Sequence, residues 1–286
     1  MSDLWTFDRA NASAMPNMAS WQVTNSQSEG YLIQASWPLG WSDVSDTQTI
    51  SKPANVVYTV DGNAMFMSAT DVVRRRQSAT VGQIATIVIA ISYLITDSNY
   101  TAPPFAGSTQ PPAYGGADAL LDFITKDVNS FIFSSVFPHV SVNQSALFGH
   151  SYGGLFTLHT LYTAPESFDV YLAASPSIWW NDRYILQEEK KFHQKSTLKH
   201  RPDVWMSYGT LEQHPEHLKG ETDEAFQKRV SDAEYLRMAD NVEEMYRRLE
   251  KTSLIKSVKK RVYQDEDHPS VIGGALSGAL YYFMGI

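Results

Sequence analysis

Short, nearly continuous apolar runs alternate along this chain with segments long enough to form helices. The runs that predict strands cover residues 30–37, 55–60, 84–93, 145–148, 170–174, 204–208 and 258–263. Most of them lack the polar–apolar alternation of a strand with one wet face, so we expect a parallel sheet that is covered on both sides. Strands that alternate with helices predict an α/β fold, a mostly parallel doubly wound sheet flanked by helices, as a single domain over residues 1–286.

The predicted helices are clearest late in the chain. Apolar side chains recur every three to five residues from Phe226 to Leu249, which predicts one long helix. Pro269 is placed to open a final helix, whose predicted buried face runs from Val271 to Leu280. Residues 101–116 are rich in Pro, Gly, Ser and Thr and have hydrophobic elements on both sides, so they predict a long surface loop.

Composition and charge exclude several kinds of partner and of site. The 286 residues carry 23 Lys+Arg against 31 Asp+Glu, and a net charge of −8 argues against nucleic acid or an anionic membrane as a partner. Because the chain has no Cys, disulfides, thiolate catalysis and cysteine-ligated metals are excluded. The apolar run at residues 84–95 is too short to span a bilayer. Residues 1–9 show no basic and apolar leader pattern, so we expect a cytosolic protein without a signal peptide.

One motif gives the strongest indication of function in this sequence. Gly149-His150-Ser151-Tyr152-Gly153 has the G-x-S-x-G spacing of a nucleophile elbow, with an apolar run before it and a predicted buried helix after it. A serine hydroxyl needs a base to take its proton, and a sharp strand-to-helix turn presents the side chain to such a base. An ordinary glycine-rich turn is the alternative. We therefore predict that Ser151 is a nucleophile.

His268 is the best candidate for the base. It follows the last predicted strand directly, at the carboxyl end where a parallel sheet presents its site. Neighbouring residues at an elbow point apart, which makes His150 a poor base. We expect His159 to be a packing residue, and His193 and His200 to lie on the surface.

The acid of a triad is expected in a loop between the serine and the histidine. Glu212 fits, since it comes three residues after Gly209 at the end of an apolar run. Its task would be to hold the imidazole in the right tautomer. Glu216 is the runner-up, and residues 265–267 are too close to His268 in sequence. The segment at residues 214–217 contains two histidines, but it offers too few convergent ligands for a metal site.

An acyl-transfer site also needs donors for the oxyanion. Tyr152 follows the candidate nucleophile at a helix N-terminus, so its backbone N–H is one such donor. The second donor would come from an earlier strand end. The turn Asp61-Gly62-Asn63 is the candidate, with a plain turn as the alternative.

Five sequence blocks together resemble the esterase D-like branch of the α/β-hydrolases, and they match its siderophore-esterase subgroup best. They are Asp61-Gly62-Asn63-Ala64, Tyr114-Gly115-Gly116-Ala117-Asp118, Gly149-His150-Ser151-Tyr152-Gly153-Gly154, Ser175-Pro176-Ser177-Ile178-Trp179-Trp180 and Asp267-His268. The resemblance spans about residues 30–286. It implies an α/β-hydrolase fold and a serine esterase that needs no cofactor and no metal.

The resemblance also implies roles for particular residues. Backbone amides of Asn63 and Tyr152 would form the oxyanion hole, and Trp179 and Trp180 would lie near the acyl pocket. Some siderophore esterases work with a Ser–His pair alone, which leaves the role of Glu212 open. Intracellular fungal members open cyclic trihydroxamates such as triacetylfusarinine C, so such a siderophore, iron-loaded or iron-free, is the expected substrate. Arg74, in the basic run at residues 74–76, is a candidate for substrate contact, with a solvated helix face as the alternative.

Two other functions stay open at this point. A general carboxylesterase or a thioesterase of the S-formylglutathione hydrolase type would use the same motif. The fold could also serve as a siderophore-binding module without turnover.

Overall fold

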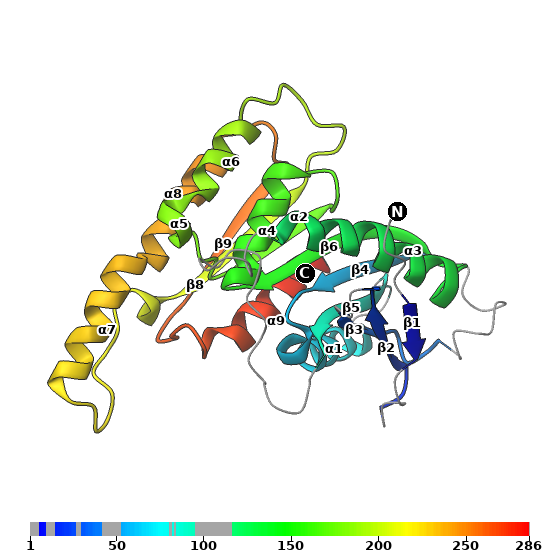
Figure 1. The fold of residues 1–286 in the computed structure, drawn as a ribbon, viewed down its shortest axis with the longest axis horizontal. Helices are drawn as coiled ribbons and strands as arrows, with labels where there is room; N and C mark the ends of the chain where they lie inside the picture. Colours follow the sequence, from blue (N-terminus) through cyan, green and yellow to red (C-terminus); the bar gives the residue numbers. More distant parts are fainter. Residues whose placement is uncertain are drawn as a thin grey trace. The chain divides into compact units, whose positions relative to one another are not determined.

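The computed structural model describes residues 6–9, 15–26, 30–41, 53–79, 82, 84–94 and 116–285. The chain divides into two compact units, one of residues 1–106 and 112–147 and the other of residues 107–111 and 148–286. Figure 1 shows their elements, and each unit is described by itself below. The loop predicted at residues 101–116 lies outside the described residues, apart from Gly116. The single-domain organisation stays a prediction.

The first unit contains strands in the order β1-β2-β3-β5-β4-β6. Their bounds are β1 (Thr6–Arg9), β2 (Met18–Thr24), β3 (Gly30–Ser36), β4 (Pro53–Thr59), β5 (Ala85–Tyr93) and β6 (Ser141–His150), which runs on into the second unit. β1, β2, β3 and β5 pair antiparallel, whereas β4 and β5 are parallel. Seven of the nine residues of β5 are buried, as its unbroken apolar run predicts.

Helices complete the first unit. α1 (Gly62–Ala79) connects β4 to β5 and packs on β5. A continuous helical stretch, α2 (Ala117–Asp122), η1 (Phe123–Val128), α3 (Asn129–Phe131) and η2 (Ile132–Val136), precedes β6 and includes two π-helical turns.

No apolar run marks β1 or β2, and the early strands pair antiparallel, whereas the apolar runs predict parallel pairing. β2 carries the signal that could have identified it. Met18, Trp21 and Val23 are buried while Gln22 is exposed, which approaches the period-two pattern of a strand with one solvated face. A search for continuous apolar runs misses such strands.

The second unit has the strand order β6-β7-β8-β9. β7 (Val170–Ala174), β8 (Asp203–Gly209) and β9 (Ser257–Tyr263) are parallel, and Gly209 of β8 lies opposite Tyr263 of β9. Both strands therefore end at the same level, and the loops that follow them start next to each other.

Helices cover the strands of the second unit. α4 (Tyr152–Thr163) packs on β7, and α9 (Val271–Phe283) packs on β7, β8 and β9. α5 (Trp180–Arg183) and α6 (Ile185–Phe192) lie between β7 and β8 in the chain. Most of the predicted apolar face of α9 is buried, from Val271 to Leu280.

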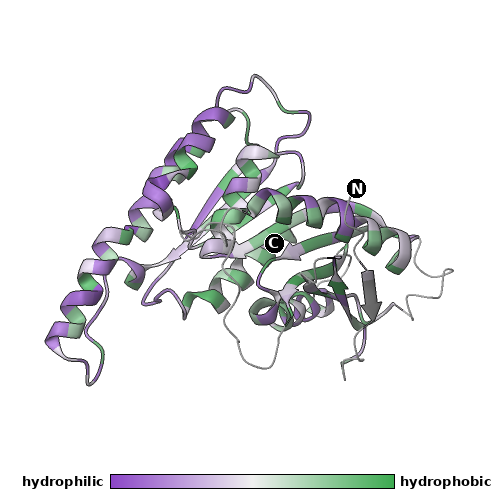
Figure 2. Ribbon diagram, viewed as in Figure 1, coloured by the Kyte–Doolittle hydropathy of each residue, from purple (hydrophilic) through white to green (hydrophobic). Residues whose placement is uncertain are grey.

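The long helix predicted from Phe226 to Leu249 is wrong in one respect. The chain forms two helices, α7 (Asp223–Leu236) and α8 (Met238–Leu249), separated by Arg237 in the left-handed region with φ of 48°. The stripe of α8 is buried on β8 and β9, whereas Tyr235 of α7 is 72% exposed. Figure 2 shows mostly hydrophilic residues along α6, α7 and α8. The apolar spacing continues through both helices, but only α8 buries its apolar stripe.

None of the helices in the described ranges is both long and apolar enough to cross a bilayer.

Candidate active site

Ser151 sits at a sharp turn between β6 and α4. Its backbone has φ of 58° and ψ of −119°, outside the usual regions for a residue other than glycine. Its N–H donates to the carbonyl of Ala174 at 3.0 Å, and its carbonyl accepts from the N–H of Ser177 at 3.1 Å. Because the last residue of β7 and the loop after it hold both backbone groups, the strained conformation is fixed, and with it the direction of the side chain.

The turn requires glycine at position 149. A Cβ atom there would lie 2.1 Å from the carbonyl oxygen of Gly153, closer than any real contact. The absence of a side chain at Gly149 lets the start of α4 fold back against the end of β6. This is the physical reason for the first glycine of the motif.

The base and the acid predicted from sequence lie beside Ser151 in the same unit. The imidazole of His268 has its Nε2 atom 2.8 Å from Oγ of Ser151 and its Nδ1 atom 2.6 Å from Oε2 of Glu212. Residues far apart in the chain thus form one hydrogen-bonded line from hydroxyl to carboxylate. This geometry can transfer the serine proton to the ring while the carboxylate orients the ring.

Glu212, at the end of η3 (Thr210–Glu212), is held on both carboxylate oxygens. Its side chain is fully buried. Oε1 accepts from Oγ of Ser175 and from the backbone N–H of Gly209, both at 2.6 Å, and Oε2 faces His268. A buried carboxylate needs such donors, since it has lost its hydration. The carboxylate is therefore oriented before any substrate binds.

Backbone packing between two loops brings Glu212 to His268. The N–H of Leu211 donates to the carbonyl of Glu266 at 3.0 Å, so the loop after β8 bonds to the loop after β9. A Cβ atom at Gly209 would lie 2.2 Å from that same carbonyl oxygen. Gly209 therefore serves two purposes, because it allows this close approach and donates its own N–H to Glu212.

The alternative acids lie elsewhere. Glu216 is exposed, and its carbonyl accepts from Arg229. Asp267 bonds locally, because its carboxylate accepts from the N–H of Ser270 at 2.9 Å. Across the described ranges, no three His, Asp or Glu side chains converge as metal ligands.

Ser175 and Ser177 lie at the site, although the sequence motifs predict no role for either residue. Ser175 is fully buried, has φ of 42°, and donates to Glu212, while Oγ of Ser177 lies 3.3 Å from Oγ of Ser151. The available signal was their position directly after an apolar run. Loops at the carboxyl ends of neighbouring parallel strands meet at the same edge of the sheet.

Replacing Ser175 by Ala should weaken the site without unfolding the protein. Glu212 would lose one of its two donors on Oε1, and a hydrogen bond to a charged group is worth about 1.5–3 kcal/mol. We therefore expect kcat/KM for an ester to fall about 10- to 100-fold. Steady-state kinetics of Ser175→Ala measure this.

Ser207→Ala is the matched control. Ser207 is equally buried on β8, and its hydroxyl has no hydrogen-bond partner among the residues that the structure describes. Near-normal activity is expected from this variant. Equal losses in the two variants would show that Ser175 does not act through Glu212.

The two expected oxyanion donors lie in different units. Tyr152 is the first residue of α4, at the positive end of the helix dipole and next to Ser151. Asn63 is the second residue of α1 in the first unit. Its side chain bonds to the backbone of Tyr93, accepting from the N–H at 2.7 Å and donating to the carbonyl at 3.1 Å. Asn63 as an oxyanion donor stays a prediction.

The tryptophan pair follows Ser177 on the loop after β7. Both rings are half-buried, and the Trp179 ring centroid lies 5.8 Å from that of Tyr152, the residue after Ser151. The indole nitrogen of Trp180 has no partner among the residues described. Trp179 therefore lies close to the candidate nucleophile, and the substrate contact expected for both rings remains a prediction.

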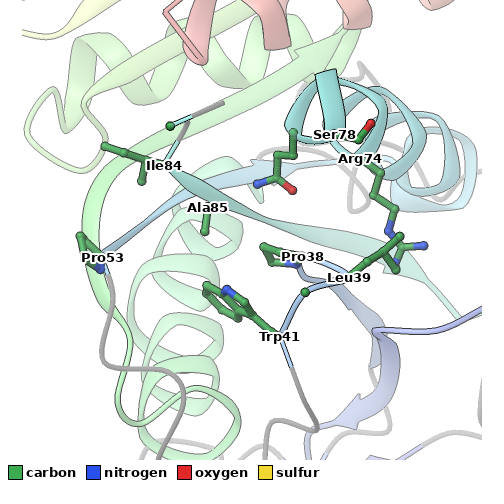
Figure 3. A pocket seen from close by; sticks show the side chains of 11 residues that line it. Pro38, Leu39, Trp41, Pro53, Arg74, Ser78, Ile84 and Ala85 are labelled. Atoms are coloured by element: carbon green, nitrogen blue, oxygen red, sulfur yellow. The ribbon is translucent and has the colours of Figure 1, made fainter. Parts of the chain in front are cut away.

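Arg74 lies in the first unit, on the wall of a pocket of about 620 Å³ together with Pro38, Leu39, Trp41 and Ile84 (Figure 3). Its guanidinium donates to the carbonyls of Pro16 at 2.6 Å and Asn17 at 3.1 Å. Desolvation lowers its pKa. These bonds connect α1 to the segment before β2, so Arg74 has a structural task, and its contact with substrate stays a prediction.

His150 is the last residue of β6 and is 7% exposed. Burial, and to a lesser extent the charge on the neighbouring His268, lowers its pKa to about 3. The folded protein therefore holds His150 neutral, whereas the unfolded chain binds a proton below a pH of roughly 6.5.

This difference predicts acid destabilisation. As the pH falls below about 6.5, His150 becomes protonated in the unfolded chain but stays neutral in the folded protein. The free energy of unfolding therefore decreases by about 2–3 kcal/mol by pH 4.5. Urea unfolding of wild type and His150→Asn at pH 7.0 and 4.5 measures the effect. The loss between the two pH values should be smaller in the variant by about that amount. Parallel losses would contradict a neutral, buried His150.

The chain is also similar to known proteins over most of its length. The profile of a protein family described as "Putative esterase" matches residues 45–253, more than half of the chain. The chain is 46% identical to a siderophore enterobactin esterase of Emericella nidulans over 97% of both proteins. It is 40% identical to a siderophore triacetylfusarinine C esterase of Aspergillus fumigatus over 96% of both.

A solved structure shows the same fold. The siderophore hydrolase EstA from Aspergillus nidulans has a TM-score of 0.86 and 45% identity, over 96% of this chain and 98% of that one. The predicted α/β-hydrolase fold, a mostly parallel sheet flanked by helices, is thereby confirmed. The chain belongs to this esterase family and is a carboxylic ester hydrolase.

Proposed function

We propose that the protein hydrolyses the ester bonds of a siderophore by serine-based acyl transfer. The hydrogen-bonded line from Ser151 through His268 to Glu212 is the observation that carries the mechanism. Siderophore-acting relatives, similar over nearly their whole length, support the choice of substrate.

In the first half of the reaction, Oγ of Ser151 attacks the ester carbonyl carbon while Nε2 of His268 takes the hydroxyl proton. The carbonyl oxygen becomes an oxyanion, which the backbone N–H groups of Tyr152 and Asn63 are proposed to stabilise. Collapse of the tetrahedral intermediate breaks the carbon–oxygen bond to the leaving alcohol, and His268 returns the proton to that alcohol.

In the second half, His268 takes a proton from a water molecule as that water attacks the acyl-serine. Collapse of the second tetrahedral intermediate breaks the bond to Oγ of Ser151, and His268 returns the proton to that oxygen. The products are a carboxylic acid and free Ser151, so one water is consumed for each ester bond. Glu212 stays ionised throughout and stabilises the imidazolium that forms twice in each cycle.

We propose a neutral cyclic trihydroxamate such as triacetylfusarinine C as the substrate. The loop that carries His268 also carries Asp265, Glu266 and Asp267, and the chain has a net charge of −8. A trianionic ferric tris-catecholate would be repelled by these carboxylates, whereas a ferric trihydroxamate is neutral. The relative that acts on triacetylfusarinine C supports this assignment.

Enterobactin, a catecholate, is the second candidate, because the relative with 46% identity is named for it. A substrate panel separates the candidates: ferric and iron-free triacetylfusarinine C, ferric and iron-free enterobactin, and S-formylglutathione, with product masses followed over time. We expect the highest kcat/KM with triacetylfusarinine C. Comparison of its ferric and iron-free forms also tests whether iron must be bound. Preference for S-formylglutathione, or binding of siderophore without turnover, would refute the proposal.

A cytosolic location and the absence of nucleic-acid and membrane partners are part of the same proposal. Fractionation of source cells would test the location, and recovery of the protein with membranes would contradict it.

A further inference from the structure

We propose that an ion pair between Arg183 and Glu244 anchors residues 179–184, the tryptophan segment, beside the nucleophile elbow, and that this anchor helps to determine which esters bind. Arg183 is then a positioning residue, because it acts on the substrate through Trp179 and Trp180. The inference rests on the proposed hydrolysis of siderophore esters at Ser151. All of these residues belong to the second unit.

The tryptophan segment contains three consecutive residues in the left-handed region. Asn181, Asp182 and Arg183 have φ of 48°, 51° and 61°. This region is unfavourable for residues other than glycine, because the Cβ atom approaches a backbone carbonyl oxygen, and such residues normally occur singly. The N–H of Arg183 donates to the carbonyl of Trp179 at 3.4 Å, so the run and the tryptophan pair form one turn. Three such residues in a row persist only where contacts with the rest of the protein hold them.

Separate contacts fix the chain on both sides of the tryptophan segment. Before it, the N–H of Ser177 donates to the carbonyl of Ser151 at 3.1 Å. After it, Arg248 of α8 binds both carboxylate oxygens of Glu189 on α6 at 2.8 Å. Glu189 is buried, so this pair is a firm attachment of α6 to α8. Loss of a contact within the segment should therefore leave α6 in place.

Arg183 provides the side-chain contact within the segment. Its guanidinium donates to Oε2 of Glu244 at 2.5 Å, and both side chains are half-buried. Glu244 lies on α8, which runs alongside α5 and α6 (Figure 1). In the described part of the chain, no other side chain of residues 180–184 has a hydrogen-bond or ion-pair partner. The ion pair is thus the side-chain bond that opposes relaxation of the left-handed run.

Trp179 connects this anchor to the site. Its ring centroid lies 5.8 Å from that of Tyr152, which follows the candidate nucleophile. We expect a bulky acyl group on Ser151 to extend as far as the Trp179 ring, whereas an acetyl group is too short to depend on it. Releasing the tryptophan segment should therefore weaken the binding of large esters and leave small ones unaffected.

Glu244 also provides a matched control. Its other carboxylate oxygen accepts from Arg237 at 2.9 Å. Arg237 is left-handed as well, with φ of 48°, but it lies between α7 and α8 and not in the tryptophan segment. Arg183→Met and Arg237→Met each remove one cation from the same carboxylate. Only the first should affect Trp179 and Trp180.

Steady-state kinetics with a large and a small ester test the effect on substrate. With ferric triacetylfusarinine C, we expect Arg183→Met to raise KM about 10-fold and to keep kcat within about threefold of wild type, as for a loss of binding alone. The value of kcat/KM for p-nitrophenyl acetate should stay unchanged, because other contacts hold Ser151, His268 and Glu212. Arg237→Met should behave as wild type with both esters.

A conservative variant tests the role of the charge. Arg183→Lys keeps a cation that can reach Glu244, so it should return KM for triacetylfusarinine C to within about threefold of wild type. A wild-type KM in Arg183→Met, or an equal rise of KM in Arg237→Met, would overturn the proposal.

The anchor can also be tested without any ester. Incorporation of 5-fluorotryptophan at the seven tryptophans gives ¹⁹F signals, and Trp179→Phe and Trp180→Phe identify two of them. Arg183→Met should shift or broaden these two signals and leave that of the buried Trp205 unchanged. Two unchanged signals would overturn the anchor. If circular dichroism shows that Arg183→Met does not fold, Arg183→Gln, which keeps a polar side chain without the charge, gives the same test.

Failure of the proposed function gives a different result. If Ser151→Ala stays active, the reaction itself is wrongly assigned, whereas the ¹⁹F signals still test the anchor. If Ser151→Ala is inactive and Arg183→Met has a wild-type KM for triacetylfusarinine C, only the inference about Arg183 fails.

Discussion

Ser151→Ala is expected to lower kcat for siderophore ester hydrolysis by about 10⁴- to 10⁶-fold, because it removes the hydroxyl that forms the acyl-enzyme. KM should change little, since the hydroxyl contributes little to ground-state binding. The fold should survive, because alanine keeps the backbone bonds from position 151 to Ala174 and Ser177. Steady-state kinetics with the preferred siderophore measure kcat and KM, and a thermal unfolding curve shows whether the variant folds.

A neighbouring hydroxyl provides the control. Oγ of Ser177 lies 3.3 Å from Oγ of Ser151, so a labelling reagent could in principle react with either residue. A fluorophosphonate should label wild type and Ser177→Ala but not Ser151→Ala. Labelling of Ser151→Ala, or ester turnover near the wild-type rate, would mean that a different residue is the nucleophile.

Glu212→Gln is expected to lower kcat about 10³- to 10⁴-fold, because it selects the wrong tautomer of His268. The two donors on Oε1, Ser175 and Gly209, require an oxygen at that position. The new amide group of glutamine must then point at Nδ1 of His268. Nδ1 would have to accept, so the ring proton moves to Nε2, which can no longer take the proton of Ser151.

Glu216→Gln is the matched control for this effect. It makes the same chemical change four residues later on an exposed side chain, and near-normal kcat is expected. If kcat fell as much in Glu216→Gln as in Glu212→Gln, the loss of a negative charge, and not the tautomer of His268, would explain the effect. Little loss in Glu212→Gln would mean that the enzyme works with a Ser–His pair alone.

Local patterns were sufficient for much of the fold and for the candidate nucleophile. The apolar runs at residues 170–174 and 204–208 predicted β7 and β8 within one residue at each end, because strands buried on both faces are continuous in sequence. The elbow at Ser151 was equally predictable. Its glycine at position 149 is required by a contact with Gly153, only four residues away.

Patterns in sequence failed where packing decided the outcome. The stripe from Phe226 to Leu249 is continuous, yet Arg237 interrupts the helix and only α8 is buried. β2 has one solvated face, so polar side chains interrupt its apolar ones and no continuous apolar run marks the strand. In both cases the deciding factor is which surface lies opposite, and sequence spacing does not contain it.

The sequence by itself determined the strand runs, the elbow and the position of His268 after the last strand, since each depends on residues that are neighbours in the chain. Only the tertiary structure shows that Glu212, rather than Glu216 or Asp267, lies beside the His268 ring, because that proximity depends on the level at which β8 and β9 end. It also decided that Ser175 holds the carboxylate and that His150 lies against the His268 ring. Such contacts join loops of different strands, and the packing of those strands sets the distances between them.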